Sequence, residues 1–169
     1  MSTLRFLHTS PVHIPSFNTV LQDVLASGHI DAAFASELTI QHMDDESLLT
    51  EARQTGITPA LKARLKATLD EAASGGADFV LCTCSSIGGA AEEMGQQTTV
   101  PVLRVDRAMA ERAIAQGTRI VVAATLQSTL APTRDLLLSV AQDAVKEVEL
   151  IDVVCESAWQ AFEAGDQQG

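Results

Sequence analysis

The strongest constraint on the fold is the alternation of short apolar segments with amphipathic ones along the chain. Six segments have the length and the aliphatic content of strands, and several are apolar throughout: residues 4–8, 38–43, 78–82, 100–105, 119–124 and 148–153. Strands that are apolar on both sides and alternate with helices are typical of a parallel sheet covered on both faces. The sequence therefore predicts an α/β fold.

The segments between these strands have the spacing and punctuation of helices. One helix is expected to end at Gly28, and another to begin at Pro59 and to end before Gly75. Three more are expected over residues 106–117, from about Pro132 onward, and over residues 156–164 with Trp159 and Phe162 on one side. The run Asp44-Asp45-Glu46 is interpreted as a helix N-terminus, with binding of a substrate amine as the alternative.

A weak internal repeat indicates two similar halves. A strand, a hydroxyl-rich turn, a proline and an amphipathic helix occur at residues 5–25 and again from residue 119 onward. We therefore expect a first α/β half over residues 1–99 and a second over residues 100–169. The second half lacks its third strand in this sequence: either it is short by nature, or the strand lies in a further segment or a partner chain. Gly165-Asp166 resembles a helix end followed by a new N-cap.

Charge and cysteine content limit the partners and the compartment. The chain has 22 acidic and 11 basic residues and a net charge of −11, which disfavours nucleic acid and anionic membrane surfaces as partners. Three cysteines, an odd number, do not indicate a disulfide framework and favour a reducing, cytoplasmic location. The sequence contains no apolar run of the roughly 18 residues that a membrane span needs, and no apolar signal segment.

The most informative stretch is residues 77–89, where an apolar strand runs into a thiol, two hydroxyls and a glycine pair. Carboxyl ends of parallel strands are where open α/β sheets bind ligands. Ser85 and Ser86 would begin the following helix, whose N-terminus stabilises an anion or a thiolate, and Gly88-Gly89 would let a ligand approach the backbone. Cys84 is therefore the candidate catalytic residue. The alternative is a small buried residue of the core.

The other cysteines and the histidines carry weaker signals. Cys82 lies within the apolar strand and is interpreted as core, and Cys155 as a packing residue. No further soft ligands accompany the Cys-x-Cys pair, so no metal site is expected. His8 and His13 flank the first turn, and each is either a proton carrier or a structural residue. The remaining two histidines, His29 and His42, do not lie beside a predicted site.

Hydroxyl side chains recur in the first turn of each half. Thr9 and Ser10 follow the first strand, and Thr125, Ser128 and Thr129 follow the strand that begins the second half. Together with Ser85 and Ser86 they could bind the oxygens of a carboxylate without an arginine. Ordinary helix capping and turn chemistry is the competing interpretation of both turns.

Two of these stretches resemble the aspartate/glutamate/hydantoin racemase superfamily, and the likeness covers essentially the whole chain. Residues 77–86 are similar to that family's strand followed by Cys-Asn-Thr, with Cys84 at the first catalytic cysteine and Ser85-Ser86 in place of Asn-Thr. Residues 121–129 resemble its Ala-Thr-x-Gly-Thr segment, with Gln127 replacing the glycine and Ser128 the second threonine. Val100-Pro101-Val102 also fits.

The resemblance implies two α/β halves with a small carboxylate between them, and two cysteines that remove and return the α-proton without a cofactor. The second cysteine would fall beyond Gly169, and Cys155 follows the wrong strand to replace it. Racemisation, decarboxylation by one cysteine, cis-trans isomerisation by a nucleophilic cysteine and simple carboxylate binding therefore all remain open. Unpaired strands in the second half also suggest a homo-oligomer.

Overall fold

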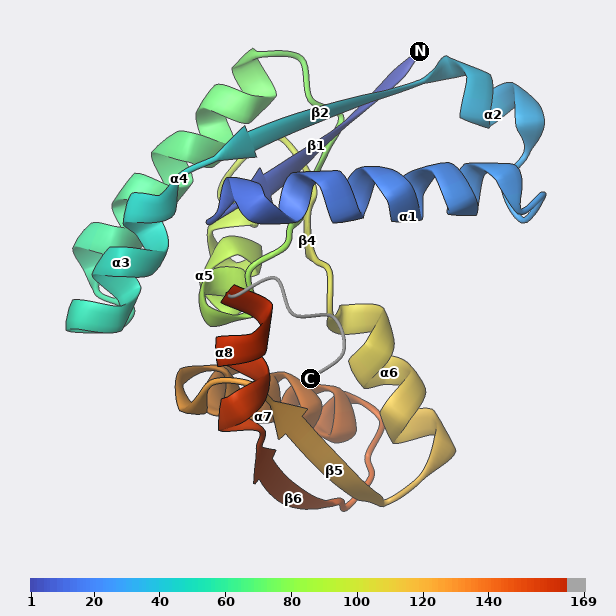
Figure 1. Cartoon of the computed structure of the whole chain (residues 1–169). Coiled ribbons are helices and arrows are strands. Elements are labelled where there is room, and N and C mark those ends of the chain that lie inside the picture. Colours follow the sequence, from blue (N-terminus) through green and yellow to red (C-terminus); the bar gives the residue numbers. More distant parts are fainter. Residues whose placement is uncertain (164–169) are drawn as a thin grey trace. The chain divides into compact units, whose positions relative to one another are not determined.

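The computed structural model describes residues 1–163 and confirms the α/β prediction (Figure 1). The first sheet has the strand order β2-β1-β3-β4, and all of its pairs are parallel. Its strands are β1 (Ser2–His8), β2 (Leu38–Asp44), β3 (Phe79–Cys82) and β4 (Val102–Arg104). The expected strands thus form within two residues of their predicted limits.

Helices connect these strands, and polar residues fix where several of them begin. The connecting elements are η1 (Pro11–His13), α1 (Ile14–Ala26), α2 (Ala32–Glu37), α3 (Glu46–Thr55), α4 (Pro59–Ser74) and α5 (Ser85–Gly95). Asp31, Asp45 and Thr58 accept hydrogen bonds from backbone N–H groups in the first turns of α2, α3 and α4. The prediction that the acidic run begins a helix is therefore confirmed at Asp45, whereas the short helix α2 was not expected.

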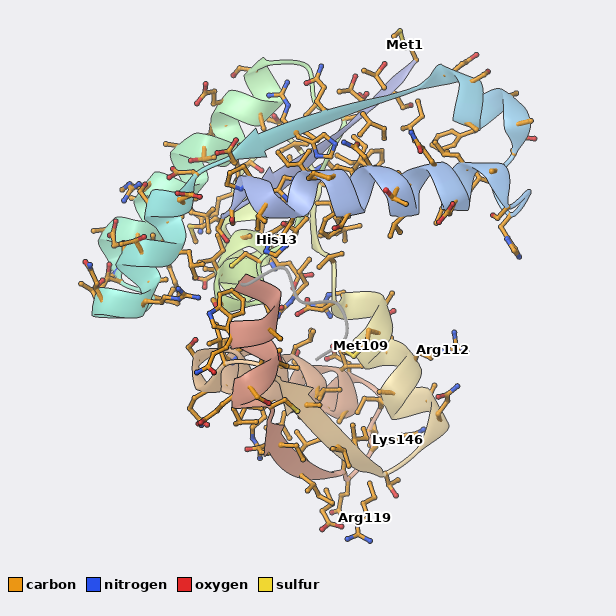
Figure 2. All side chains as sticks on the ribbon, in the orientation of Figure 1. Met1, His13, Met109, Arg112, Arg119 and Lys146 are labelled. Carbon is orange, nitrogen blue, oxygen red and sulfur yellow. The ribbon has the colours of Figure 1, made fainter. Side chains whose placement is uncertain are left out.

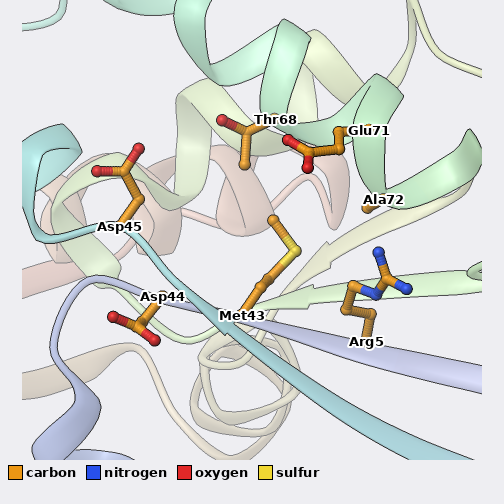
Figure 3. Close-up of a pocket in the computed structure, with 7 residues that line it drawn as sticks. All are labelled: Arg5, Met43, Asp44, Asp45, Thr68, Glu71 and Ala72. Carbon is orange, nitrogen blue, oxygen red and sulfur yellow. The ribbon is translucent and has the colours of Figure 1, made fainter. Parts of the chain in front are cut away.

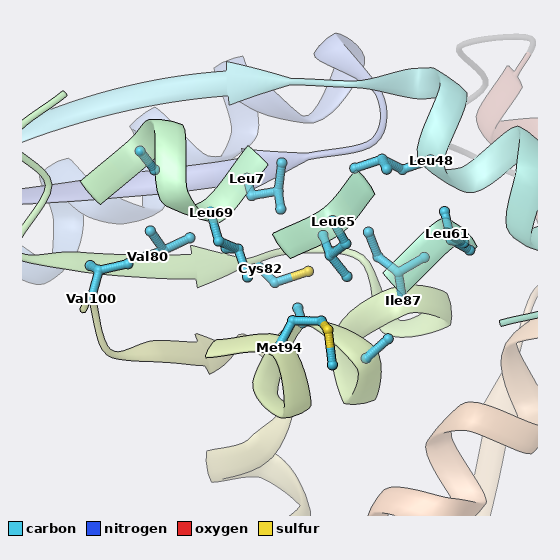
Figure 4. Packing of buried hydrophobic residues seen from close by; sticks show 13 residues of the cluster. Leu7, Leu48, Leu61, Leu65, Leu69, Val80, Cys82, Ile87, Met94 and Val100 are labelled. Atoms are coloured by element: carbon cyan, nitrogen blue, oxygen red, sulfur yellow. The ribbon is translucent and has the colours of Figure 1, made fainter. Parts of the chain in front are cut away.

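One core holds the first sheet to α3, α4 and α5. Leu61, Leu65 and Leu69 face inward from successive turns of α4 and are fully buried. They pack with Leu7, Val80, Cys82 and Ile87 from the sheet and α5, as Figure 4 shows. The spacing of these leucines is the helical period that the sequence displays, so the apolar pattern directly accounts for this layer.

A second group of elements has its own sheet and core. The strands β5 (Arg119–Ala124) and β6 (Glu149–Val154) pair in parallel, and α6 (Arg107–Gln116), α7 (Gln127–Asp143) and α8 (Glu156–Glu163) accompany them. Its core is formed by aliphatic side chains, among them Ile114, Val122 and Leu137. Lys146 (Figure 2) donates a hydrogen bond to the Ile114 carbonyl over 2.7 Å and ties the end of α7 to α6.

Backbone contacts divide the chain into Met1–Val105 and Asp106–Gly169, called unit 1 and unit 2 below. Strand β4 pairs with β3 and belongs to unit 1, although the sequence suggested a boundary after residue 99. The helix expected from Pro132 begins earlier, at Gln127, and carries this proline in its interior. Side-chain features expected at Phe162 and the turn expected at Gly165-Asp166 lie outside the described residues.

The two units share a backbone arrangement that matches the internal repeat. In unit 1 the Asp45 N–H donates to the His8 carbonyl over 3.0 Å, and in unit 2 the Cys155 N–H donates to the Ala124 carbonyl over 2.8 Å. Each bond joins the residue after the second strand to the last residue of the first strand, and a helix follows in both cases. The repeat in the sequence thus corresponds to a repeated strand-to-helix connection.

Candidate active site

Cys84 lies where β3 ends and α5 begins. It is the N-cap residue of α5, in an extended backbone conformation, and it is half-buried against the core of unit 1. Ser85 and Ser86 are the first two residues of the helix, so their N–H groups have no partner within α5. The predicted arrangement of a thiol at a helix N-terminus, at the carboxyl end of a central strand, is therefore present.

The first turn of unit 1 lies at the same edge of the sheet. β1 and β3 are neighbours with Leu7 opposite Cys82, and the Thr83 N–H donates to the Leu7 carbonyl over 3.0 Å. Because parallel strands end at one edge, Thr9 and Ser10 emerge beside the turn that carries Cys84. Thr125, Ser128 and Thr129 belong to unit 2, where they follow β5 and begin α7.

The predicted binding side chains are not used for capping. Within residues 1–163, the Cys84 thiol makes no hydrogen bond, and neither does any of the hydroxyls of Thr9, Ser10, Ser85, Ser86, Thr125, Ser128 and Thr129. No side chain caps the N-terminus of η1, α5 or α7, in contrast to α2, α3 and α4. Helix capping, the competing interpretation of these hydroxyls, therefore does not describe this structure.

Two histidines in contact, His8 buried and His42 partly buried, adjoin the Cys84 turn, and the sequence did not indicate this contact. The His8 side chain is 0% exposed, with Nδ1 2.9 Å from the Thr83 hydroxyl and Nε2 2.9 Å from Nδ1 of His42. Burial, reinforced by His42 and His13 and opposed by Asp44, lowers the pKa of His8 from 6.5 to about 4. Burial also lowers the pKa of His42.

Arg104 is a second residue that the sequence did not indicate. It lies at the end of β4, is buried, and donates a hydrogen bond from Nη2 to the Ser85 carbonyl over 3.4 Å. A Cβ atom at Gly88 would lie 3.0 Å from Nε of Arg104, so the glycine leaves room for this guanidinium. Our expectation that the glycine pair admits a ligand is thus corrected at Gly88, and a positive charge lies near the first turn of α5.

The three cysteines occupy different environments. Cys82 is fully buried in the core of unit 1, as predicted. Cys155 is exposed, so the prediction that it is a packing residue is wrong. No three metal-binding side chains come together in the described part of the chain.

A separate pocket of about 250 Å³ lies between the sheet and α4 and contains neither Cys84 nor any of the predicted carboxylate-binding hydroxyls (Figure 3). Its lining combines Arg5 with three carboxylates: Asp44, Asp45 and Glu71. Arg5 already donates to Gln41 over 3.0 Å and to the Gly75 carbonyl over 3.2 Å. An excess of carboxylates disfavours an anionic ligand, so this pocket is not the expected carboxylate site.

Solved structures support the fold. The chain aligns with a candidate Asp/Glu racemase from Yersinia pestis at 17% identity and a TM-score of 0.64, over 98% of this chain and 71% of that one. It aligns with glutamate racemase from Aquifex pyrophilus at 12% identity and a TM-score of 0.59, over 92% of this chain and 57% of that one. It also aligns with an aspartate racemase homologue from Pyrococcus horikoshii at 11% identity and a TM-score of 0.60, over 96% of this chain and 69% of that one.

Sequence comparison identifies the family. No curated protein is significantly similar to the chain. No helix in residues 1–163 is long and apolar enough to cross a membrane. The family model for Asp/Glu/Hydantoin racemases matches residues 21–168, which is most of the sequence and includes the Cys84 turn. The chain therefore belongs to the Asp/Glu/Hydantoin racemase family.

Proposed function

We propose that this chain is a cofactor-independent, racemase-like isomerase acting at the α-carbon of a small carboxylate, of amino-acid or hydantoin type. The observation that carries the proposal is the thiol of Cys84 at a helix N-terminus without a side-chain cap, beside hydroxyls that have no hydrogen-bond partner among residues 1–163. Such groups are free to serve a ligand, and membership of the racemase family supports the same chemistry.

Cys84 acts in this proposal as the base. Its thiolate takes the α-proton and becomes a thiol, while the electron pair of the broken C–H bond moves into the carboxylate to give an enediolate. The amides of Ser85 and Ser86, and the hydroxyls of Thr9 and Ser10, would donate to the oxygens that gain charge. One preorganised donor of this kind lowers a barrier by about 3 kcal/mol. The Cys84 thiol can return its proton only to the face from which it came, so inversion requires that a second acid, such as water, protonates the opposite face of the enediolate.

The hydroxyls that follow β5 in unit 2 are also part of this proposal. Thr125, Ser128 and Thr129 follow β5 as Thr9 and Ser10 follow β1, so we propose that their hydroxyls also bind carboxylate oxygens. Arg104 adds a positive charge near the first turn of α5, which favours an anionic substrate at this end of unit 1.

The second candidate function is a cysteine-dependent decarboxylase or cis-trans isomerase of the same superfamily. It is favoured by the position of Cys84 just after the third strand of unit 1, where one thiol can act as base or nucleophile. A chemistry that uses one cysteine has no need of a second. The third candidate is a carboxylate-binding protein without turnover.

An NMR screen separates the three. The protein is incubated in deuterated buffer with aspartate, glutamate, hydantoins, substituted malonates and maleate. Loss of the α-proton signal from one acid, at a rate proportional to protein concentration, is the expected result. Carbon dioxide release from a malonate or conversion of maleate would transfer the assignment to the second function, and line broadening without turnover to the third.

We also propose that the chain forms a homo-oligomer in the cytoplasm. Val121 and Val153 lie on neighbouring strands, β5 and β6, and are 59% and 41% exposed. Parallel sheets are ordinarily covered on both faces, so such side chains favour a partner. Sedimentation velocity on the wild type and on Val121→Glu tests this: we expect an oligomer that the charge dissociates, and a wild-type monomer would contradict it.

A further inference from the structure

A continuous chain of hydrogen-bonding side chains runs from the Cys84 turn to the surface. It begins at the Thr83 hydroxyl, continues through the rings of His8 and His42, and ends at Asn18 on α1. All three contacts between neighbouring members measure 2.9 Å. These hydrogen bonds link β1, β2 and α1 to the turn between β3 and α5.

Aromatic packing holds both rings in place. Phe6 stacks on His42 with 5.1 Å between ring centroids, and Phe17 of α1 meets the His8 ring edge-on at 5.4 Å. The two imidazoles also stack on each other at 5.2 Å. Rings packed in this way rotate only if neighbouring side chains move, so the direction of each N–H bond is fixed by the fold.

The hydrogen bonds from Thr83 to Asn18 all point the same way, from donor to acceptor. Both rings are neutral near pH 7, because burial lowers both pKa values, and a neutral ring has one N–H and one acceptor nitrogen. The Asn18 Oδ1 only accepts, so His42 carries its hydrogen on Nε2 and accepts at Nδ1 from Nε2 of His8. Nδ1 of His8 is then an acceptor. We assign the single hydroxyl proton of Thr83 to this 2.9 Å contact and not to the Leu7 carbonyl, which lies 3.2 Å from the hydroxyl.

Thr83 receives support from two directions. Its N–H donates to the Leu7 carbonyl over 3.0 Å. Its hydroxyl lies 3.2 Å from the same carbonyl and 2.9 Å from Nδ1 of His8, so both its backbone and its side chain are tied to β1. Thr83 is the single residue between the end of β3 and Cys84, the N-cap of α5. The position of Thr83 therefore determines where Cys84 leaves the sheet.

We propose that His8 is a positioning residue for Cys84. Acting through the Thr83 hydroxyl, and itself oriented by His42 and Asn18, it holds Cys84 at the N-cap of α5. This inference rests on the role proposed above for Cys84. His8 touches no reacting atom; it keeps the thiol within reach of the first-turn amides.

Two matched pairs of variants test the proposal, all made in a Cys155→Ser background that removes the exposed thiol. Thr83→Val removes the hydroxyl, and His8→Gln removes the acceptor at the position of Nδ1. Thr83→Ser retains the hydroxyl, and His8→Asn retains an acceptor near Nδ1. The readout is the rate at which iodoacetamide alkylates Cys84 at pH 7, measured by peptide mass. The exposed His29→Gln variant is the control.

We expect Thr83→Val and His8→Gln to alkylate about three-fold more slowly, because a displaced thiolate loses the stabilisation of the helix N-terminus. Thr83→Ser, His8→Asn and the control should stay close to the background rate. Unchanged rates in folded Thr83→Val and His8→Gln would overturn the proposal. So would slowing in all four variants in proportion to their loss of unfolding free energy.

A second measurement needs no variant. Long-range ¹H–¹⁵N correlation spectra of the wild type should show His8 and His42 both protonated on Nε2; protonation of His8 on Nδ1 would refute the assigned direction. Neither measurement uses a substrate. Failure to find α-proton exchange would therefore count against the proposed function, while the alkylation and tautomer results would still decide the role of His8.

Discussion

Acidification should destabilise this protein through His8, because the folded chain resists protonation of its buried ring. Burial, more than the neighbouring His42 and His13, lowers its pKa from 6.5 to about 4, and Asp44 offsets only part of this effect. In the unfolded chain the ring is exposed to water and has its ordinary pKa. Between these two values the unfolded chain binds a proton that the folded chain does not.

The sign and the size follow from this difference. Stability rises with pH wherever the unfolded state binds more protons. Above pH 6.5 the ring is neutral in both states and has no effect; below it, the unfolding free energy falls by at most about 1.4 kcal/mol per pH unit. The loss is therefore up to about 2 kcal/mol at pH 5 and about 3 kcal/mol near pH 4. His42, whose pKa is also lowered, acts in the same direction.

The assay is urea unfolding at pH 7 and pH 5, followed by far-ultraviolet circular dichroism because the single tryptophan, Trp159, reports on unit 2. The perturbation is His8→Asn, which removes the titrating ring and retains an acceptor for Thr83. We expect the wild type to lose up to about 2 kcal/mol more than this variant between the two pH values. The exposed His29→Asn variant should lose as much as the wild type. Equal losses in the wild type and His8→Asn would refute the reasoning.

Two further predictions concern backbone and packing, each with a reciprocal or matched control. Val145 follows α7, has a φ of 53° and is 92% exposed, so Val145→Gly should raise the unfolding free energy by about 1 kcal/mol. Gly76 has a φ of 83°, so Gly76→Val should lower the unfolding free energy by a comparable amount. Thermal melts measure both changes. A Cβ at Gly95 would lie 2.6 Å from the Cβ of Val102, so Gly95→Ala should cost about 1–3 kcal/mol. Gly89→Ala, with its nearest contact at 3.6 Å, should be neutral or stabilising; equal losses at Gly95 and Gly89 would contradict this packing argument.

Features written in local sequence were predictable. Strand β3 is apolar throughout, and Leu61, Leu65 and Leu69 repeat at helical spacing, so the burial of these leucines followed from the pattern alone. The position of Cys84 at a helix N-terminus also followed, since a helix-prone segment comes directly after the strand. Pro132 was misleading because proline is common in the first turn of a helix, and here α7 had already begun five residues earlier.

Features that depend on contacts between distant segments were not predictable. His8 and His42 meet only because β1 and β2 pair in parallel, and Asn18 reaches His42 from a helix between them in sequence. Neither histidine has a local motif: His8 was singled out only for its place beside the first turn, and His42 was set aside. Arg104 was missed for the same reason: its place under α5 becomes visible only when β4 pairs with β3.

The central claim is that the Cys84 thiol removes an α-proton, and the most direct test is the rate of deuterium incorporation into the acid identified by the NMR screen. Cys84→Ser is compared with Cys155→Ser, which changes the exposed thiol. The claim predicts that Cys84→Ser remains folded and loses at least about a hundred-fold in rate, as is usual when a general base is removed, whereas Cys155→Ser matches the wild type. A folded Cys84→Ser protein that exchanges the α-proton at the wild-type rate would contradict it.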